Sequence, residues 1–556
     1  MKPARLILAT ALLLAGCDDT PPSLQPDGAP PGETPTYWRD VAPLVQRECL
    51  TCHVEGGIGP VPLDGYENLE RHAASVVDAV RSGYMPPWMP DRECREFENQ
   101  RGLSTEEREV FARWFAGGTP EGDPADAPAP PAPPPTLEVT HVARMAEPYV
   151  PDATTPDDYR CFILDHEFTE DSFLVGRNVI PDQTALVHHV LTYAVPPELV
   201  PMIEAADAAA DGPGYTCFGG PVPSDDGGEA GTLGLISMGG WVPGAVPHVE
   251  RPGRGVYVPG GSRLVMQVHY NLLSAEPAPD MTEYHMALTT EEPERRTTTF
   301  PTAITDLNIP AGMPDVREAR TFRNYRSEPI EITGLTPHMH LLGTRIGMRR
   351  VPSVDGSGVD ECLIDVPRWD FNWQEGYALR EDDVVRLMPG EGLELTCEYD
   401  NSPSNQPVVN GEQVEPRDVS WGEGTLDEMC LLYVQHEEDW TGPPALDCSP
   451  AADCLASCAT SDAECLLACE EVGSGCRPCA LQATLGCAQD SCLAAYAPAG
   501  SCIQSCIMSY VLLGGSFARC METECPSAWP GVRDCVAGVV DAGTCDGALT
   551  ECGVSR

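Results

Sequence analysis

Two kinds of hydrophobic pattern divide the chain. Near its start, apolar residues recur at helical spacing in three stretches, 37–48, 68–81 and 105–115. Farther along, short β-branched and aromatic stretches are separated by Gly and Pro about every ten residues, which is typical of antiparallel strands. Examples are 185–194, 264–272 and 330–335. The pattern therefore predicts a multidomain chain, with an all-α unit followed by two antiparallel, jelly-roll-like β-sandwiches.

The limits of these units follow from two segments that lack large apolar residues. Residues 18–36 and 120–136 are rich in Pro, Ala, Gly and Asp, and we interpret both as linkers. The helical unit then spans 37–119, and the sandwiches span 137–290 and 291–445. Because both linkers are rich in proline, we expect the helical unit to swing on a short tether.

The N-terminus carries a targeting signal. Lys2 and Arg5 precede the apolar run 6–14, and the run ends in Leu14-Ala15-Gly16-Cys17. This arrangement resembles a bacterial lipoprotein signal peptide over 1–17, with Cys17 as the lipidated residue. The alternative is a secretory signal with a chance cysteine. No other stretch approaches the ~20 apolar residues of a membrane span. We expect a bacterial envelope protein, facing the periplasm or the cell surface, that contacts a membrane only through its lipid.

Charge and cysteine content narrow the possible partners. The chain has 34 Lys plus Arg against 85 Asp plus Glu, so its formal charge is -51. Nucleic acid and anionic membrane surfaces would be repelled. Twenty-five cysteines favour an oxidising compartment.

Residues 446–556 form a separate, cysteine-rich tail with sixteen of those cysteines between Cys448 and Cys552. Several pairs lie four residues apart, on one face of a helix, so we predict short helices joined by disulfides. Zinc or a metal cluster is the alternative.

The helical unit contains Cys49-Leu50-Thr51-Cys52-His53, the attachment sequence of a c-type haem. Cys49 and Cys52 would form the thioether bonds, and His53 would bind the iron. A disulfide or half of a zinc site is the alternative. We predict Met85, directly before a proline, as the second axial ligand, with Met89 as the fallback. Either Met could instead serve only in packing.

Three histidine groups lie in the predicted sandwiches. With the later Met429 they supply six soft or borderline ligands, enough for two sets of three, which suits two redox-active copper ions: His188, His189, His269, His338, His340 and Met429. Residues two apart on a strand share a face, so His338 and His340 can bind one ion while Met339 points away. The adjacent pair His188 and His189 needs a bulge or a strand end to bind together.

Five segments in order make residues 137–445 resemble the copper type II, ascorbate-dependent monooxygenases, the group that contains dopamine beta-monooxygenase and peptidylglycine alpha-hydroxylating monooxygenase. The matching segments are Leu186-Val187-His188-His189, Gln267-Val268-His269-Tyr270, Pro337-His338-Met339-His340, Asp370-Phe371-Asn372-Trp373-Gln374, and the stretch from Trp421 and Gly422 through Thr425 to Asp427-Glu428-Met429-Cys430.

The resemblance implies a role for each ligand set. His188, His189 and His269 would hold the electron-storing copper, and His338, His340 and Met429 would hold the catalytic copper that binds oxygen. It also implies a disulfide between Cys430 and Cys397. The implied reaction is hydroxylation of an activated C–H bond with O2. Ascorbate is the reductant in the animal enzymes, and the fused haem suggests a periplasmic or respiratory donor here.

The substrate is less defined. The peptide-amidating branch binds a carboxylate through Arg, Asn and Tyr, and this chain has Thr336, Leu431 and Tyr433 at those positions. We therefore expect a small organic molecule with a weak C–H bond rather than a peptide. Two other interpretations stay open: a non-catalytic lipoprotein that carries electrons or binds copper, and an adhesion protein that acts through its tail.

Overall fold

A computed structural model describes residues 34–443 with short gaps, together with part of the C-terminal tail. The gaps are 56–58, 60, 99, 128–135, 155–156, 218, 224–234, 273–275, 327 and 410–411, and the described tail residues are 492, 502–503, 506 and 517–541. The predictions for the signal peptide, for Cys17, for most of the first linker, for residues 128–135 of the second linker and for most of the tail lie outside the described residues. None of the described helices is long and apolar enough to cross a membrane.

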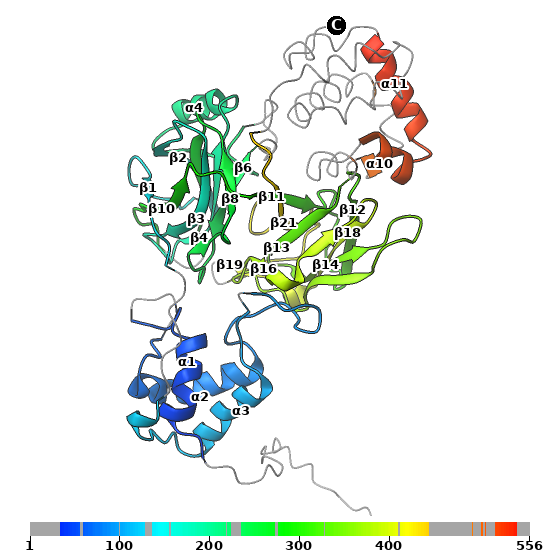
Figure 1. The fold of residues 1–556 in the computed structure, drawn as a ribbon. Coiled ribbons are helices and arrows are strands. Elements are labelled where there is room, and N and C mark those ends of the chain that lie inside the picture. The colour runs from blue at the N-terminus through cyan, green and yellow to red at the C-terminus, as the bar shows by residue number, and fades with distance from the viewer. Residues whose placement is uncertain are drawn as a thin grey trace, which may run out of the picture.

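The N-terminal part is a small helical unit (Figure 1) with its own apolar core around Trp114 and Phe111. The helix at 105–116 begins with a capping box, in which Ser104 and Glu107 satisfy each other's backbone N–H groups. All three predicted helical stretches are helical in the structure; the cytochrome identity of the unit stays a prediction. Its elements are η1 (Tyr37–Val41), α1 (Ala42–Glu48), α2 (Tyr66–Ser82), α3 (Thr105–Ala116) and η2 (Pro124–Asp126).

The next part of the chain is a β-sandwich. A five-stranded sheet in the order β5-β2-β9-β4-β6 packs on strands β1, β10, β3 and β8, to which β7 is added, and the two layers share one apolar core. The elements are β1 (His141–Arg144), β2 (Asp157–Glu167), β3 (Ser172–Ile180), β4 (Val187–Val195), α4 (Val200–Ala209), β5 (Tyr215–Thr216), β6 (Ile236–Trp241), β7 (His248–Val249), β8 (Arg254–Val258), β9 (Arg263–Asn271) and β10 (Glu283–Thr289).

A second sandwich follows, with its own core. Strands β11, β21, β13, β16 and β17 form one layer, and β12-β18-β14-β15 forms the other. The elements are β11 (Arg295–Ala303), β12 (Val316–Arg323), β13 (Ile330–His338), β14 (Gly343–Val351), β15 (Glu361–Val366), β16 (Tyr377–Ala378), η3 (Glu381–Asp383), β17 (Val385–Leu387), β18 (Gly392–Tyr399), η4 (Pro403–Asn405), the hairpin β19 (Val408–Val409) and β20 (Glu412–Gln413), and β21 (Leu431–Asp439).

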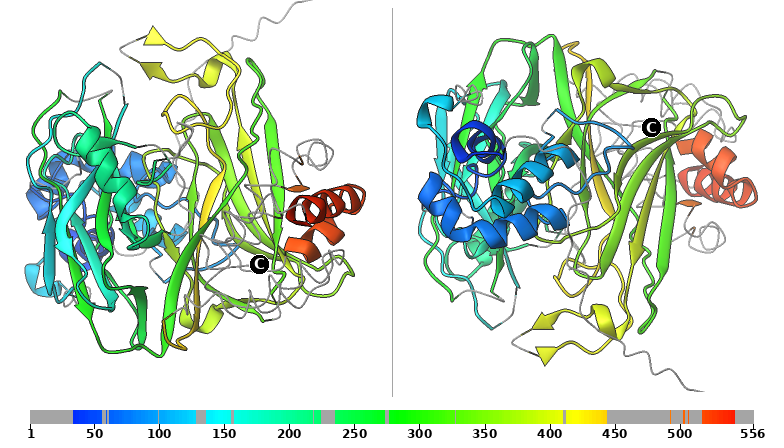
Figure 2. Two further views of the ribbon diagram at one scale, coloured as in Figure 1. Left: turned by 90° about the horizontal axis from the view of Figure 1, so that it is seen from above. Right: turned by 90° about the horizontal axis from the view of Figure 1, so that it is seen from below.

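The two sandwiches share a sheet. Strand β8 of the first pairs in parallel with β11 of the second, through Arg254 with Arg295 and Gly255 with Arg296. A ten-stranded sheet therefore runs through both units. The antiparallel sandwiches expected from the strand pattern are present, and the shared sheet fixes them side by side (Figure 2).

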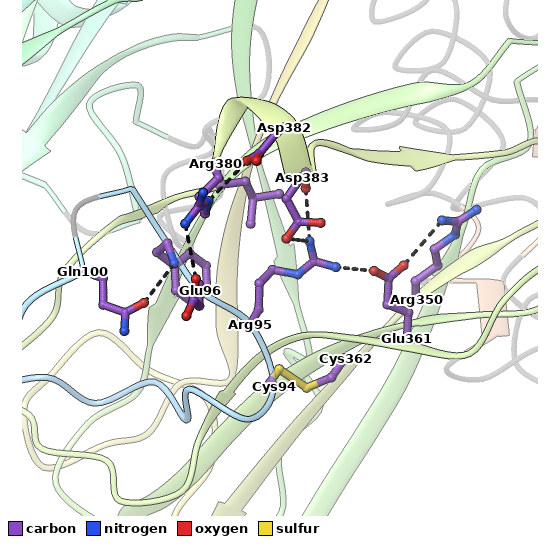
Figure 3. A network of polar contacts seen from close by, with 12 residues as sticks. Cys94, Arg95, Glu96, Gln100, Arg350, Glu361, Cys362, Arg380, Asp382 and Asp383 are labelled. Atoms are coloured by element: carbon purple, nitrogen blue, oxygen red, sulfur yellow. Dashed lines mark hydrogen bonds and ion pairs between the residues drawn. A yellow bond between two sulfur atoms is a disulfide. The ribbon is translucent and has the colours of Figure 1, made fainter. Parts of the chain in front are cut away.

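The helical unit is fastened to the second sandwich, so the prediction that it swings on a tether is wrong. We call residues 84–101 the docking strap. Its Cys94 forms a disulfide with Cys362, 268 residues away. Beside that disulfide, the buried guanidinium of Arg95 pairs with Glu361 and Asp383 (Figure 3). A charge this deeply buried is stable only with such partners. A covalent bond and a paired buried charge therefore hold the strap in place.

The described part of the tail agrees with disulfide-linked helices. It contains α10 (Phe517–Glu524) and α11 (Trp529–Asp541), and the disulfides pair Cys492 with Cys535, Cys502 with Cys525 and Cys506 with Cys520. Glu524 contacts Arg323 and Tyr325, which places α10 against the second sandwich, on the side away from the first (Figure 2).

Candidate copper and haem sites

The first histidine set is assembled by two neighbouring strands. His188 and His189 lie on β4, and His269 lies opposite His189 on β9. The register of this strand pair shifts between Val187 and His189. The irregularity that an adjacent pair of ligands requires is therefore present, and it turns both imidazoles toward one place.

Ring nitrogens of the three histidines converge, which fits a metal ion. One donor atom from each lies within 4.8 Å of the others. The Nδ1 atoms of His188 and His189 are 3.3 Å apart. The Nδ1 of His269 is buried and has no hydrogen-bond partner among the described residues. A copper ion would satisfy these nitrogens, because imidazole is a favourable copper ligand.

The other ring nitrogen of His269 is held by Asp157. Its Nε2 lies 2.8 Å from Asp157 Oδ1, a carboxylate–histidine arrangement common at metal sites. Asp157 also accepts a hydrogen bond from Thr425 Oγ1 in the second sandwich, at 2.5 Å. Tyr159 stacks on the His269 ring with centroids 4.0 Å apart, and its hydroxyl donates to the Glu423 carbonyl oxygen. The environment of His269 is thus built from both sandwiches.

The second set begins where β13 ends. His338 is the last residue of the strand, Met339 is fully buried in the core of the second sandwich, and the His338 and His340 rings lie 5.2 Å apart. Met339 thus points away from its histidine neighbours, as the alternation predicts. His340 Nδ1 lies 3.1 Å from the Asp427 carbonyl oxygen, which leaves Nε2 for a metal.

Met429 is positioned through its neighbour Glu428. The buried carboxylate of Glu428 accepts hydrogen bonds from the backbone N–H groups of His340 at 3.0 Å, Leu342 at 2.6 Å and Met429 at 3.3 Å. Burial raises the pKa of Glu428 to about 8, although these donors lower it. The Met429 side chain is 4% exposed. One carboxyl group therefore joins the segment of His340 to the segment of Met429.

Burial keeps the histidines of both sets neutral. Burial lowers the pKa of His188 to about 4 and of His338 to about 3. It lowers the pKa of His340 to about 4, and those of His189 and His269 fall well below the usual value. Neutral imidazoles are the form that binds a metal.

The two sets lie close together across the boundary between the sandwiches. The rings of His189 and His338 are 6.0 Å apart. Phe371 stacks on His188 with centroids 4.4 Å apart, and its ring lies 5.9 Å from that of His340. The five histidines therefore form one cluster that can hold two redox-active ions.

Comparison with known proteins supports a family for the second sandwich. Residues 319–448 match the family model described as copper type II ascorbate-dependent monooxygenase, C-terminal domain. The match includes His338, His340 and Met429, and it begins after the first histidine set. It supports copper as a cofactor, and it implies O2, a substrate and ascorbate as the reductant.

No curated protein matches the chain. The major capsid protein P2 from bacteriophage PM2 is similar in structure with a TM-score of 0.23 and 8% identity, covering 54% of this chain and 98% of that chain. For PBCV-1 VP54, fitted into a reconstruction of the virophage Sputnik, the TM-score is 0.21 and the identity 8%, with 54% and 94% covered. Likenesses this weak carry no argument.

Within the second sandwich, the three positions that correspond to the carboxylate-binding residues of the peptide-amidating branch are neighbours. Thr336 on β13 lies opposite Tyr433 on β21, and Leu431 lies two residues before Tyr433. Leu431 and Tyr433 both pack beside Met429. Apart from the hydroxyl groups of Thr336 and Tyr433, these three side chains are apolar.

Two disulfides stabilise the backbone next to the candidate copper ligands. Cys397 pairs with Cys430, the partner that the resemblance implies, directly after Met429. Cys161 pairs with Cys217, and Gln267 donates a hydrogen bond to the Cys217 carbonyl oxygen at 3.4 Å. Gln267 is therefore buried structural support for β9, and in this structure it orients no histidine.

The Cys49-Leu50-Thr51-Cys52-His53 segment fits a covalently bound haem. Cys49 and Cys52 are free thiols rather than a disulfide. The Nδ1 of His53 lies 2.9 Å from the Val61 carbonyl oxygen, which leaves Nε2 for an iron ligand. Gly59 packs so closely on His53 that a Cβ there would lie 2.6 Å from Nδ1. The loop is thus shaped to hold the imidazole.

The two methionines proposed as axial ligands differ in their contacts. Met89 packs against the core of the second sandwich, and its Sδ accepts a hydrogen bond from the Asp370 N–H at 3.3 Å. Met85 is half-buried and lies three residues beyond the end of α2 at Ser82. The contacts of Met89 favour Met85 as the iron ligand, which stays a prediction.

Proposed function

We propose that the protein is a copper-dependent monooxygenase that hydroxylates an activated C–H bond of a small organic molecule. The convergence of five neutral, buried or half-buried histidines at the boundary of the two sandwiches supports this most directly. The family match over residues 319–448 adds to it. The overall reaction takes up O2, two electrons and two protons, places one oxygen atom in the substrate and releases the other as water.

Each ligand set has its own proposed role. His188, His189 and His269 hold the copper that stores an electron, since three imidazoles stabilise both oxidation states. His338, His340 and Met429 hold the copper that meets O2, because a thioether favours the reduced ion. Asp157 orients His269, and Glu428 keeps the His340 segment beside Met429.

We propose that electrons enter through a haem c bound at Cys49, Cys52 and His53, with Met85 as the second axial ligand. The donor to this haem would be a periplasmic or respiratory protein, and ascorbate would serve in its place. The signal sequence and Cys17 support a lipid-anchored protein of the bacterial envelope, and the described disulfides suit that compartment.

The proposed activity is tested by supplying ascorbate and ¹⁸O2 to the copper-loaded protein with a panel of molecules that contain benzylic or similarly weak C–H bonds. We expect one labelled oxygen atom in a product. Met429→Ala should abolish labelling while the first site still binds copper. His285→Ala, outside both sets, is the matched control and should behave as wild type. Oxygen uptake that never labels any product would favour the non-catalytic alternative.

A further inference from the structure

One short segment contacts the histidine cluster on one side and the helical unit on the other. We call residues 369–375 the bridge segment. Toward the cluster, the Trp369 indole N–H donates to the His340 carbonyl oxygen at 3.1 Å. Phe371 stacks on His188, and the Gln374 side chain hydrogen-bonds His338. The bridge segment thus touches a member of each ligand set.

Toward the helical unit, the bridge segment contacts two residues of the docking strap, Met89 and the last residue of the strap, Arg101. The Asp370 N–H donates to Met89 Sδ at 3.3 Å, and Glu375 pairs with Arg101. Arg101 also lies near the haem-attachment sequence, because the N–H of the next residue, Gly102, donates to the Glu48 side chain at 2.7 Å, directly before Cys49. Met89 is only four residues beyond Met85. Both contacts therefore come from residues close to the candidate haem ligands.

The docking strap holds this junction in one arrangement. In addition to the Cys94–Cys362 disulfide and the Arg95 ion pairs (Figure 3), Phe97 is 4% exposed in the core of the second sandwich. The Glu98 N–H donates to the Ala378 carbonyl oxygen at 2.9 Å. These contacts flank the bridge segment along the chain, because Ala378 follows it and Cys362 precedes it.

We propose that the bridge segment is the internal path by which electrons pass from the haem to the copper ions, with Met89 and Phe371 as its two contact residues. This inference rests on the proposed function. Each step oxidises one ferrous haem and reduces one Cu(II) to Cu(I), and moves no proton. Electron transfer is faster through bonded and contacting atoms than across gaps, and Met89 contacts Asp370 while the adjacent Phe371 stacks on His188. Met89 and Phe371 act as positioning residues.

The test uses the full-length holoprotein without oxygen. A photogenerated reductant supplies less than one electron per haem. The haem absorbance and the electron paramagnetic resonance signal of Cu(II) are then followed in time. In wild type, we expect the haem to be reoxidised as Cu(II) disappears, at a rate independent of protein concentration. Met89→Leu and Phe371→Leu should each slow this step several-fold.

Two controls separate a lost path from damaged sites. Met348→Leu and Phe322→Leu change buried residues of the same core, outside the bridge segment, and should transfer electrons at the wild-type rate. Met89→Leu should keep the haem spectrum, since the contacts of Met89 are to the second sandwich. Phe371→Leu should keep the electron paramagnetic resonance spectrum of both Cu(II) ions. If this variant alters that spectrum, the Met89→Leu variant alone tests the path.

Unchanged rates in both bridge variants, or a wild-type rate that rises with protein concentration, would overturn the path. If wild type shows no internal transfer but ascorbate still drives labelling of a product, the path is wrong and the monooxygenase stands. If the haem reduces copper through the bridge but no substrate is ever labelled, the path stands and the proposed activity is wrong.

Discussion

At the scale of single residues, the structure brings together side chains that lie far apart in the sequence. Asp157 contacts His269, 112 positions away, and Thr425, 268 positions away. The histidine spacing predicts the ligands and even the irregularity on β4, because both follow from strand geometry. The sequence offers no comparable signal for Asp157, since only tertiary contacts bring it to the site. Glu428 and Phe371 lie inside recognised segments, yet their roles depend on partners from other strands.

Asp157→Asn is expected to weaken copper binding at the first site. The amide is a poorer acceptor for the His269 N–H, and loss of such an orienting contact typically costs about 10- to 100-fold in metal affinity. Thr425→Val removes only the hydroxyl contact with Asp157 from the second sandwich and should have a smaller effect. Copper titration of both variants, followed by the resonance of the bound ion, measures this. Equal losses in the two variants would assign the effect to the boundary rather than to His269.

At the scale of elements, the docking strap changes the predicted organisation. Composition predicts a linker over residues 120–136, but Pro120 and Glu121 accept backbone hydrogen bonds from Tyr37 and Trp38 of the helical unit. Composition also cannot reveal that Cys94 pairs with Cys362, because disulfide partners are not deducible from sequence. The three predicted helices are present since each has local signals, such as the Ser104 cap. The attachment of their unit depends on contacts far apart in the chain, and no periodicity reports those.

Removing the strap's disulfide should loosen the helical unit. The double variant Cys94→Ala/Cys362→Ala is expected to lose about 2–5 kcal/mol of stability, because the bond closes a long loop. Hydrogen exchange in residues 84–101 should increase while exchange in β9 stays slow. The matched variant Cys161→Ala/Cys217→Ala should show the reverse distribution. Unchanged exchange in the strap would mean that the ion pairs of Arg95 suffice to hold it.

At the scale of the whole molecule, the strand pattern predicts both sandwiches but not the ten-stranded sheet that runs through both of them. The parallel pairing of β8 with β11 involves only two residue pairs, too short to leave a signal in the sequence. The pairing joins the two units, and both histidine sets lie in one cluster at their boundary. That cluster affects the stability of the metal-free protein as well as copper binding.

The metal-free protein should lose stability as the pH falls from about 7 to about 5. Burial lowers the pKa values of His188, His338 and His340 from 6.5 to about 3–4, so these groups are neutral when folded. The unfolded chain binds protons below pH 6.5, and unfolding is therefore favoured by acid. The raised pKa of Glu428 makes the folded protein more stable as the pH falls, but this is one group against several histidines. The midpoint of urea unfolding, measured across this pH range, reports the loss of stability. The His338→Gln variant should lose less stability than wild type. A midpoint that rises as the pH falls would contradict the prediction.

The most direct test of a haem-linked dicopper enzyme is to measure copper and iron in the same sample. The protein is matured in a bacterial envelope that attaches haem, and it is then reloaded with Cu(II) and freed of loosely bound metal. The account predicts two coppers for each iron, with one copper lost in His269→Ala and the iron unchanged. One iron without tightly bound copper would contradict the dicopper site, and copper without iron would contradict the haem.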